Sequence, residues 1–358
     1  TVNSGQLTLG YFQSLVPGSS SGVFHVATGS ILRLNGSQTF EAASSITGAG
    51  GLIHGGGDAV MLGSFDLTGP LDVALGTLQF SLTPSIIGNV TLSGGNLEFP
   101  SGATLNGNVA IDDGILQADG PVTVAGAFQQ SEGSVQGTDV VTVGGLFTWT
   151  GGRQWGVGET ILNGGTAISG ADTKRIADRT LTFNTATEWT GTGPLDLRWG
   201  AVINVNAPFS IATDADMVYL QGNIPSLNIT DSFTKSAGAG ETIISAATVN
   251  DGSIEVSSGQ LRFTENFDQG DSGSLTVNIA GAGDFDAFPV AKAATLDGTL
   301  NINLLDGYEP PLSETFEILT AVSVNGVFDP VNGTAITAGR KFDVTYAASS
   351  VSLVVVPE

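Results

Sequence analysis

The chain lacks cysteine altogether and has little positive charge. Lys and Arg total 11 of 358 residues against 34 Asp and Glu, which gives a formal net charge of −23. Without cysteine there is no disulfide and no thiol chemistry, although this leaves the cellular compartment open. The acidic balance argues against nucleic acid and anionic membrane surfaces as partners, because like charges repel. Cations and neutral molecules remain possible partners.

Long apolar runs and histidines are also scarce. No run of about 18 apolar residues occurs, so we predict no membrane-spanning helix. His25 and His54 are the only histidines, which leaves a zinc centre without a ligand set and a Gly-x-Ser-x-Gly elbow without a complete triad. The first residues, TVNSGQLTLG, lack the basic and apolar regions of a signal peptide. We interpret the start at Thr1 as a processed or trimmed end.

Glycine is abundant, with 51 residues, and much of it recurs every nineteen residues. One glycine column contains Gly57, Gly76, Gly95, Gly114, Gly133 and Gly152, and a second contains Gly50, Gly69, Gly88, Gly107, Gly126, Gly145 and Gly164. An apolar column keeps the same step, at Leu71, Val90, Val109, Phe128 and Phe147. Around the second glycine column the sequence alternates between apolar and other residues, which is typical of strands with one buried face.

A nineteen-residue unit is too short for a strand-helix-strand repeat but suits one coil of a solenoid. We therefore predict an all-β, right-handed parallel β-helix, most regular over residues 50–170. An odd period would turn each side chain to the other face, so the corners must reset the alternation. Glycine suits such corners because it accepts positive φ.

The pattern predicts two regions, a β-helix over residues 1–270 and a β-rich cap or assembly domain over residues 271–358. A cap is expected because an open last coil would expose an unpaired strand edge. Within the first region, the stretch GADTKRIADRT lacks strand alternation and holds Lys174, Arg175 and Arg179. We predict that it is a loop or short helical turn leaving the solenoid, either solvated or facing a partner.

The C-terminal region resembles a family of exported proteins. The residues that carry the resemblance are Gly298-Thr299-Leu300, Gly307-Tyr308, Phe316-Glu317-Ile318-Leu319, Gly326-Val327-Phe328 and Val356-Pro357-Glu358. They resemble secreted bacterial parallel β-helix proteins of the autotransporter-passenger-like type, many of which end in a PEP-CTERM sorting segment. The chain stops one residue short of the full Pro-Glu-Pro. The resemblance implies export by a Gram-negative-type bacterium, an extracellular or cell-surface location and no catalytic activity.

Acidic pairs are the candidates for a metal site. Asp284 and Asp286 are two residues apart, so in a strand both would lie on one face and could share Ca²⁺. Asp268 and Asp271 lie at the proposed junction between the two regions. One pair supplies fewer than the six to eight oxygens that calcium takes, so solvated carboxylates are the alternative. No other cofactor is expected.

Two sets of bulky residues have alternative interpretations. His54 and Trp149 fall in an apolar column and are predicted to lie in the core. Trp155, Trp189 and Trp199 could either pack or offer a stacking surface for sugar rings.

We expect a non-enzymatic extracellular structural protein, an acidic rod that self-assembles head to tail into filaments. Its contacts would be the strand-like sequences at the termini, residues 1–12 and 350–358. The alternatives are a monomeric adhesin and a β-helix that binds or cleaves polysaccharide. The polysaccharide function would require aligned Asp, Lys or Arg and aromatic residues on one face of successive coils.

Overall fold

The computed structural model describes residues 1–10, 18–337 and 339–358, and every regular element in these ranges is a β-strand. The chain divides into two compact units, residues 1–167 with 172–182, and residues 168–171 with 183–358. Together they contain about 14 solenoid turns averaging about 21 residues. The predicted all-β solenoid is therefore confirmed. None of the described elements is a helix that could cross a membrane.

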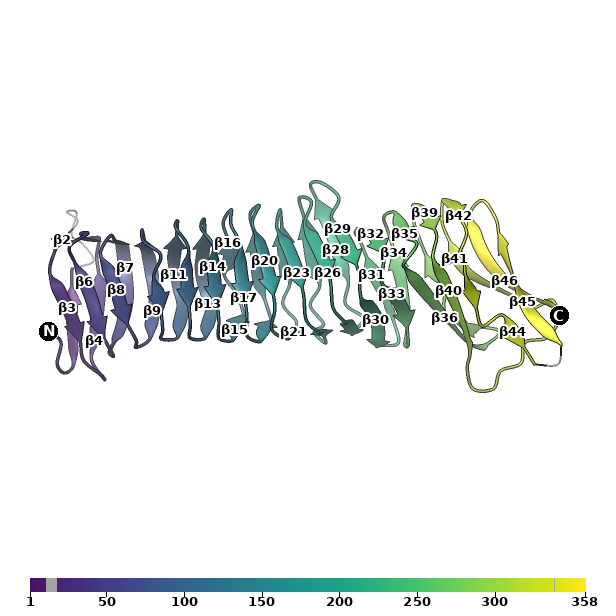
Figure 1. Cartoon of the computed structure of the whole chain (residues 1–358), viewed down its shortest axis with the longest axis horizontal. Helices are drawn as coiled ribbons and strands as arrows, with labels where there is room; N and C mark the ends of the chain where they lie inside the picture. The colour runs from purple at the N-terminus through teal and green to yellow at the C-terminus, as the bar shows by residue number, and fades with distance from the viewer. Residues whose placement is uncertain (11–17, 338) are drawn as a thin grey trace. The chain divides into compact units, whose positions relative to one another are not determined.

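Unit 1 is a stack of parallel coils (Figure 1). Its strands are β1 (Gln6–Leu9), β2 (Gly18–Ser20), β3 (Val23–Val26), β4 (Ile31–Asn35), β5 (Gln38–Phe40), β6 (Ser45–Gly48), β7 (Gly51–Met61), β8 (Ser64–Leu67), β9 (Leu71–Phe80), β10 (Ser85–Ile86), β11 (Val90–Phe99), β12 (Ala103–Leu105), β13 (Val109–Ala118), β14 (Val122–Val124), β15 (Phe128–Gln130), β16 (Ser134–Gln136), β17 (Val141–Val143), β18 (Phe147–Trp149), β19 (Gly152–Trp155), β20 (Glu159–Leu162) and β22 (Lys174–Ala177). The strands β21 (Thr166–Ile168) and β23 (Thr180–Phe183) include residues of both units.

Each coil of unit 1 has three faces. In one coil these are β15, β16 and β17, which pair in parallel with β18, β19 and β20 of the next coil. The second face is the surface formed by β5, the C-terminal halves of β7, β9, β11 and β13, and then β16, β19 and β22. It is the face that carries the unit 1 site described below.

The nineteen-residue period holds where the sequence is most regular. The predicted apolar column Leu71, Val90, Val109, Phe128 and Phe147 is paired residue by residue. Like residues consequently stack on like: the rings of Phe128 and Phe147 lie 5.4 Å apart between centroids. In other coils the period lengthens, with Gln6 opposite Ile31.

The interior is filled by the inward residues of every strand. His54 and Trp149 are fully buried, which confirms their predicted core positions. The ring nitrogen Nε2 of His54 lies 3.0 Å from the Gly57 carbonyl oxygen, and burial lowers the pKa of His54. Burial in the core therefore favours the neutral form of this histidine.

The two glycine columns serve different purposes. Most of the first column has positive φ, for example 62° at Gly133, as predicted for corners. Register shifts after Leu92, in the pairing of β11 with β13, reset the alternation at the same corner. The second column does not need positive φ. A Cβ on Gly88 would lie 1.9 Å from the Gly69 carbonyl oxygen, so these glycines are required because successive backbones stack closely.

The stretch around Lys174 was predicted to leave the solenoid, and this prediction is wrong. Residues 174–177 form β22, whose Lys174 and Ala177 pair with Gly152 and Trp155 of β19. The side chains of Lys174 and Arg179 are buried. Hydrogen bonds to backbone carbonyls, described below for Arg179, allow these cations to occupy positions that normally hold apolar residues.

Unit 2 continues the same architecture within its own residues. Its strands are β24 (Thr187–Trp189), β25 (Leu195–Arg198), β26 (Val202–Val205), β27 (Phe209–Ala212), β28 (Met217–Gln221), β29 (Ser226–Ile229), β30 (Ser232–Ala237), β31 (Glu241–Ile244), β32 (Ala247–Asn250), β33 (Ser253–Val256), β34 (Gln260–Phe263), β35 (Phe267–Gln269), β36 (Ser274–Gly281), β37 (Asp284–Phe285), β38 (Phe288–Pro289), β39 (Ala293–Leu296), β40 (Thr299–Leu304), β41 (Thr315–Thr320), β42 (Ser323–Gly326), β43 (Val331–Asn332), β44 (Ala335–Ile336), β45 (Arg340–Tyr346) and β46 (Ser350–Pro357). Parallel pairing runs from β33 through β36 to β40, and from β35 through β39 to β42. The predicted boundary at residue 271 falls inside these ladders.

The C-terminal strands form a curled mixed sheet in the order β38-β41-β46-β45-β44 (Figure 1). Strand β46 pairs antiparallel with both β41 and β45. Its side chains Val351, Leu353 and Val355 are buried. Both edges of β46 are therefore paired within the chain, so residues 350–358, predicted as an assembly contact, offer no open strand edge.

Candidate functional site

The structure separates the four aspartates predicted as calcium ligands. Asp284 and Asp286 line one cleft in unit 2, next to the hairpin of β36 and β37. Asp268 lies in β35, exposed and opposite Thr295, and Asp271 lies in the turn before β36. Neither of the last two lines the cleft.

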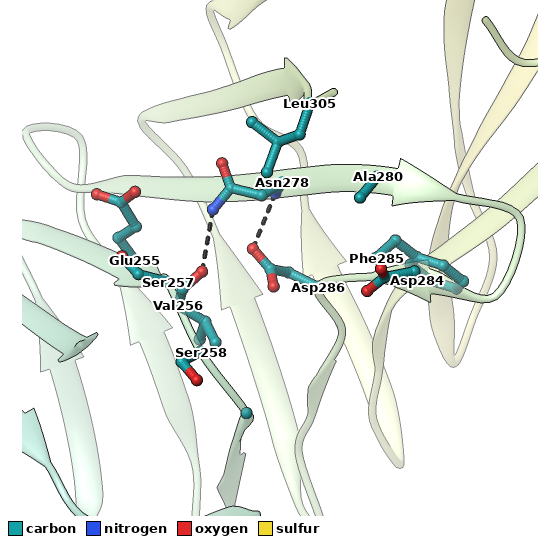
Figure 2. Close-up of a pocket in the computed structure, with 11 residues that line it drawn as sticks. Glu255, Val256, Ser257, Ser258, Asn278, Ala280, Asp284, Phe285, Asp286 and Leu305 are labelled. Atoms are coloured by element: carbon teal, nitrogen blue, oxygen red, sulfur yellow. Dashed lines mark hydrogen bonds between the residues drawn. The ribbon is translucent and has the colours of Figure 1, made fainter. Parts of the chain in front are cut away.

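The cleft has a volume of about 320 Å³ and is lined by three carboxylates, Glu255, Asp284 and Asp286. Figure 2 shows Asp286 directed at the backbone of Asn278, whose N–H donates to Asp286 Oδ2 at 2.8 Å. The Asn278 side chain in turn donates to the Val256 carbonyl at 3.0 Å. Burial raises the pKa of Asp286 to about 6, and Glu255 and Asp284 add to the increase.

Among the carboxylates that line this cleft, Asp286 is already bonded within the protein. One oxygen of Asp286 already accepts a backbone hydrogen bond. Within residues 1–10, 18–337 and 339–358, no three His, Asp or Glu side chains are grouped so that they could hold a metal ion. Calcium binding at these aspartates therefore stays a prediction, and the geometry itself supports only a hydrogen-bonded acidic cleft.

A second site lies on the second face of unit 1. The register stacks Ser134, Arg153 and Arg175 on successive coils. Arg153 and Arg175 line a shallow hollow of about 290 Å³ together with Asp113 and Glu132. This hollow therefore combines two of the chain's few cations with two carboxylates.

Trp155, two residues after Arg153 in β19, lines another hollow of the same unit. Its side chain is 41% exposed, and the guanidinium carbon of Arg153 lies 5.7 Å from the indole centroid. The second hollow, of about 320 Å³, is lined by Trp155 and the exposed Val157, with Asp119 and Asp178 among its polar residues.

The four tryptophans do not form one stacking surface. Trp149 and Trp189 are fully buried, whereas Trp155 in unit 1 and Trp199 in unit 2 are exposed. Trp155 has the guanidinium of Arg153 over its ring.

Sequence reasoning did not group Asp113, Glu132, Arg153 and Arg175. The available signal was the nineteen-residue step, which places Arg153 one coil after Ser134. Arg175 does not follow the nineteen-residue step, because the coil between Arg153 and Arg175 is longer. Its segment was also interpreted as a loop. Backbone register between coils places these residues together. No local sequence motif therefore predicts the group.

These features define the protein as a β-solenoid with a C-terminal mixed sheet. No family model matches the chain, and no curated protein matches it either. Its function has to be argued from the surfaces themselves.

Proposed function

We propose that this protein is a non-enzymatic structural protein of the bacterial cell surface or extracellular matrix, whose copies associate through strand edges of the solenoid. The observation that carries the proposal is the edge of β1. In the part of the chain that the structure describes, β1 pairs along one edge only, with β4. Residues Gln6 to Thr8 are exposed, and Leu7, which is in register with the buried Leu32, keeps 37% exposure.

An unpaired edge offers backbone N–H and C=O groups to another strand. The matching edge in unit 2 is not β46, which is paired on both sides. It is the short β43, which pairs in parallel with β40. This pairing extends the ladder of parallel strands that runs from β33 through β36 to β40. Parallel pairing of β1 from one copy with β43 of the next would be heterologous, and heterologous contacts build filaments when they do not close.

The extracellular location is supported by the resemblance of the C-terminal residues, from Gly298 to Glu358, to exported β-helix proteins. The acidic composition is consistent with a location away from nucleic acid and anionic lipid.

Electron microscopy of the purified chain tests the proposal. We expect filaments from the unaltered protein and their loss in Leu7→Lys, which places a charge on the open edge. The control is Thr123→Lys, which adds the same charge at an exposed position of the internal strand β14. Uniform monomers in the unaltered protein would refute self-association. Dimers alone would show that like edges pair and that filaments do not form.

A second candidate function is polysaccharide binding. It is favoured by Trp155, Arg153 and the surrounding carboxylates, which lie on one face of successive coils. This is the arrangement that a sugar-binding solenoid requires, because sugar rings stack on aromatic faces and their hydroxyls bond to polar side chains.

A further inference from the structure

A column of polar side chains runs along the second face of unit 1 and ends at Trp155. Its members are Gln79, Glu98, Gln117 and Gln136, followed by Trp155. Backbone register places Gln79 opposite Glu98, Glu98 opposite Gln117, and Gln117 opposite Gln136. Val135 pairs with Gln154, so Trp155, the residue after Gln154, follows Gln136 in the column. All five side chains are partly or fully exposed.

The column presents the same kind of group on every coil. Amides and a carboxylate offer both hydrogen-bond donors and acceptors. The Gln117 side chain donates to Asp119 Oδ2 at 2.8 Å, and Asp119 also receives the Thr138 backbone N–H at 3.2 Å. These bonds orient the Gln117 amide, so its remaining donor and acceptor positions are held in place before a ligand arrives.

Trp155 supplies the apolar surface that polar groups cannot. Its exposed indole lies beside Val157, which is 67% exposed, and under the guanidinium of Arg153. The C–H face of a sugar ring can pack against such an indole while its hydroxyls reach the neighbouring polar side chains. Tryptophan bears a large apolar area with little conformational freedom to lose, which suits it to anchor a ligand.

The surrounding charges select a neutral ligand. In the first hollow Asp113 and Glu132 offset Arg153 and Arg175, and the second hollow, which Trp155 lines, adds Asp119 and Asp178 without a further cation. The whole chain carries a net charge of −23. A polyanion would be repelled by these carboxylates, whereas sugar hydroxyls can donate hydrogen bonds to them.

The spacing selects a linear polymer. Successive coils lie about 4.8 Å apart, the distance between neighbouring strands. This is close to the length of one sugar residue in an extended chain, so contacts made on one coil can be repeated on the next.

We propose that a linear neutral polysaccharide binds lengthwise along this column, with one sugar ring stacked on Trp155 and its neighbours hydrogen-bonded to Gln136, Gln117 and Glu98. This inference rests on the second candidate function above and assigns its ligand class and its site. It does not depend on self-association through β1.

Affinity electrophoresis of the full chain tests the proposal. Native gels are cast with hydroxyethyl cellulose, laminarin or glucomannan as neutral polymers, and with polygalacturonate or alginate as anionic ones. We expect retardation in at least one neutral gel and none in the anionic gels. Trp155→Ala should weaken binding at least tenfold, and Gln136→Ala should weaken it several-fold. Trp155→Phe should restore part of the binding, because an aromatic face returns.

Trp199→Ala is the matched control, because it removes an exposed tryptophan of similar exposure, 37% against 41%, from unit 2. Equal thermal unfolding of the variants would show that a loss of binding is not a loss of fold. Neutral binding that survives Trp155→Ala would overturn this site while leaving the second candidate function standing. Retardation by anionic gels alone would overturn the ligand class. Absence of retardation in every gel would overturn both the site and that function.

Discussion

At the scale of single residues, the most informative side chain is the buried Arg179. Its Nε donates to Thr160 Oγ1 at 2.9 Å, and its Nη2 donates to the Glu159 carbonyl at 2.9 Å. Its Nη1 lies 3.3 Å from the Trp155 carbonyl oxygen. Burial lowers the pKa of Arg179 to about 10, so the side chain is still protonated at neutral pH. The solenoid thus satisfies an internal cation with backbone carbonyls.

Arg179→Met should destabilise the protein strongly. The change removes the charged donor that reaches Thr160 Oγ1 and the carbonyls of Trp155 and Glu159, and puts an apolar side chain among these polar groups. Depriving buried acceptors of a donor costs about 1–3 kcal/mol, and more where the hydrogen bond was to a charged group. Arg153→Met, at an exposed position, should change stability by no more than about 0.5 kcal/mol. Urea unfolding followed by circular dichroism measures both, and equal midpoints would contradict the internal role of Arg179.

Asp286 should make the stability of unit 2 depend on pH. Its pKa is raised from 3.8 to about 6 in the folded state, first by burial. The folded state therefore binds this proton more tightly than the unfolded chain does. The resulting stabilisation is complete below pH 3.8 and is lost as the pH rises through about 6.

The variant Asp286→Asn isolates this effect, because an amide oxygen can still accept the Asn278 N–H bond but does not titrate. Between pH 4 and pH 7, the thermal unfolding temperature of the unaltered chain should fall relative to that of Asp286→Asn. Asp284→Asn in the same hairpin is the control and should keep most of the pH dependence, because burial is the largest cause of the raised Asp286 pKa and Asp284 is the smallest. Parallel profiles for Asp286→Asn and the unaltered protein would refute the assignment.

At the scale of elements, the close stacking of coils can be tested at two adjacent glycines. A Cβ on Gly145 would lie 2.3 Å from the Gly126 carbonyl oxygen, whereas a Cβ on Gly144 meets nothing closer than 3.5 Å. Gly145→Ala should therefore force the coils apart at a cost of about 1–3 kcal/mol. Gly144→Ala should be neutral or stabilising by up to about 1 kcal/mol. Chemical denaturation compares them, and a harmless Gly145→Ala would contradict the stacking argument.

The sequence predicted those elements whose signal is repeated along the chain. Columns such as Val90, Val109 and Phe128 revealed the coil because each turn repeats the same packing problem. The strand β22 was missed because Lys174 occupies an inward position, and its burial depends on carbonyl partners that no local pattern shows. The antiparallel pairing of β46 and the grouping of Arg153 with Arg175 were missed because both depend on contacts distant in sequence.

The whole C-terminal sheet should unfold when β46 is removed. Deleting residues 350–358 strips β41 and β45 of their shared partner and uncovers the core residues Phe316 and Phe342. We expect rapid proteolysis within residues 310–349 and new binding of a hydrophobic dye. A truncated chain that resists proteolysis as well as the full chain does would show that β46 is dispensable.

At the scale of the whole molecule, charge should govern self-association. A net charge of −23 means that approaching copies repel one another, and this repulsion is screened over about 30 Å at 0.01 M salt but over about 8 Å at 0.15 M. Filaments should therefore form more readily as sodium chloride is raised, because the strand edges can then approach. If screening is the cause, calcium chloride and magnesium chloride at equal ionic strength act alike. Light scattering measures this, and assembly that needs calcium and is reversed by a chelator at constant ionic strength would instead establish a calcium site, to be sought first with Asp284→Asn.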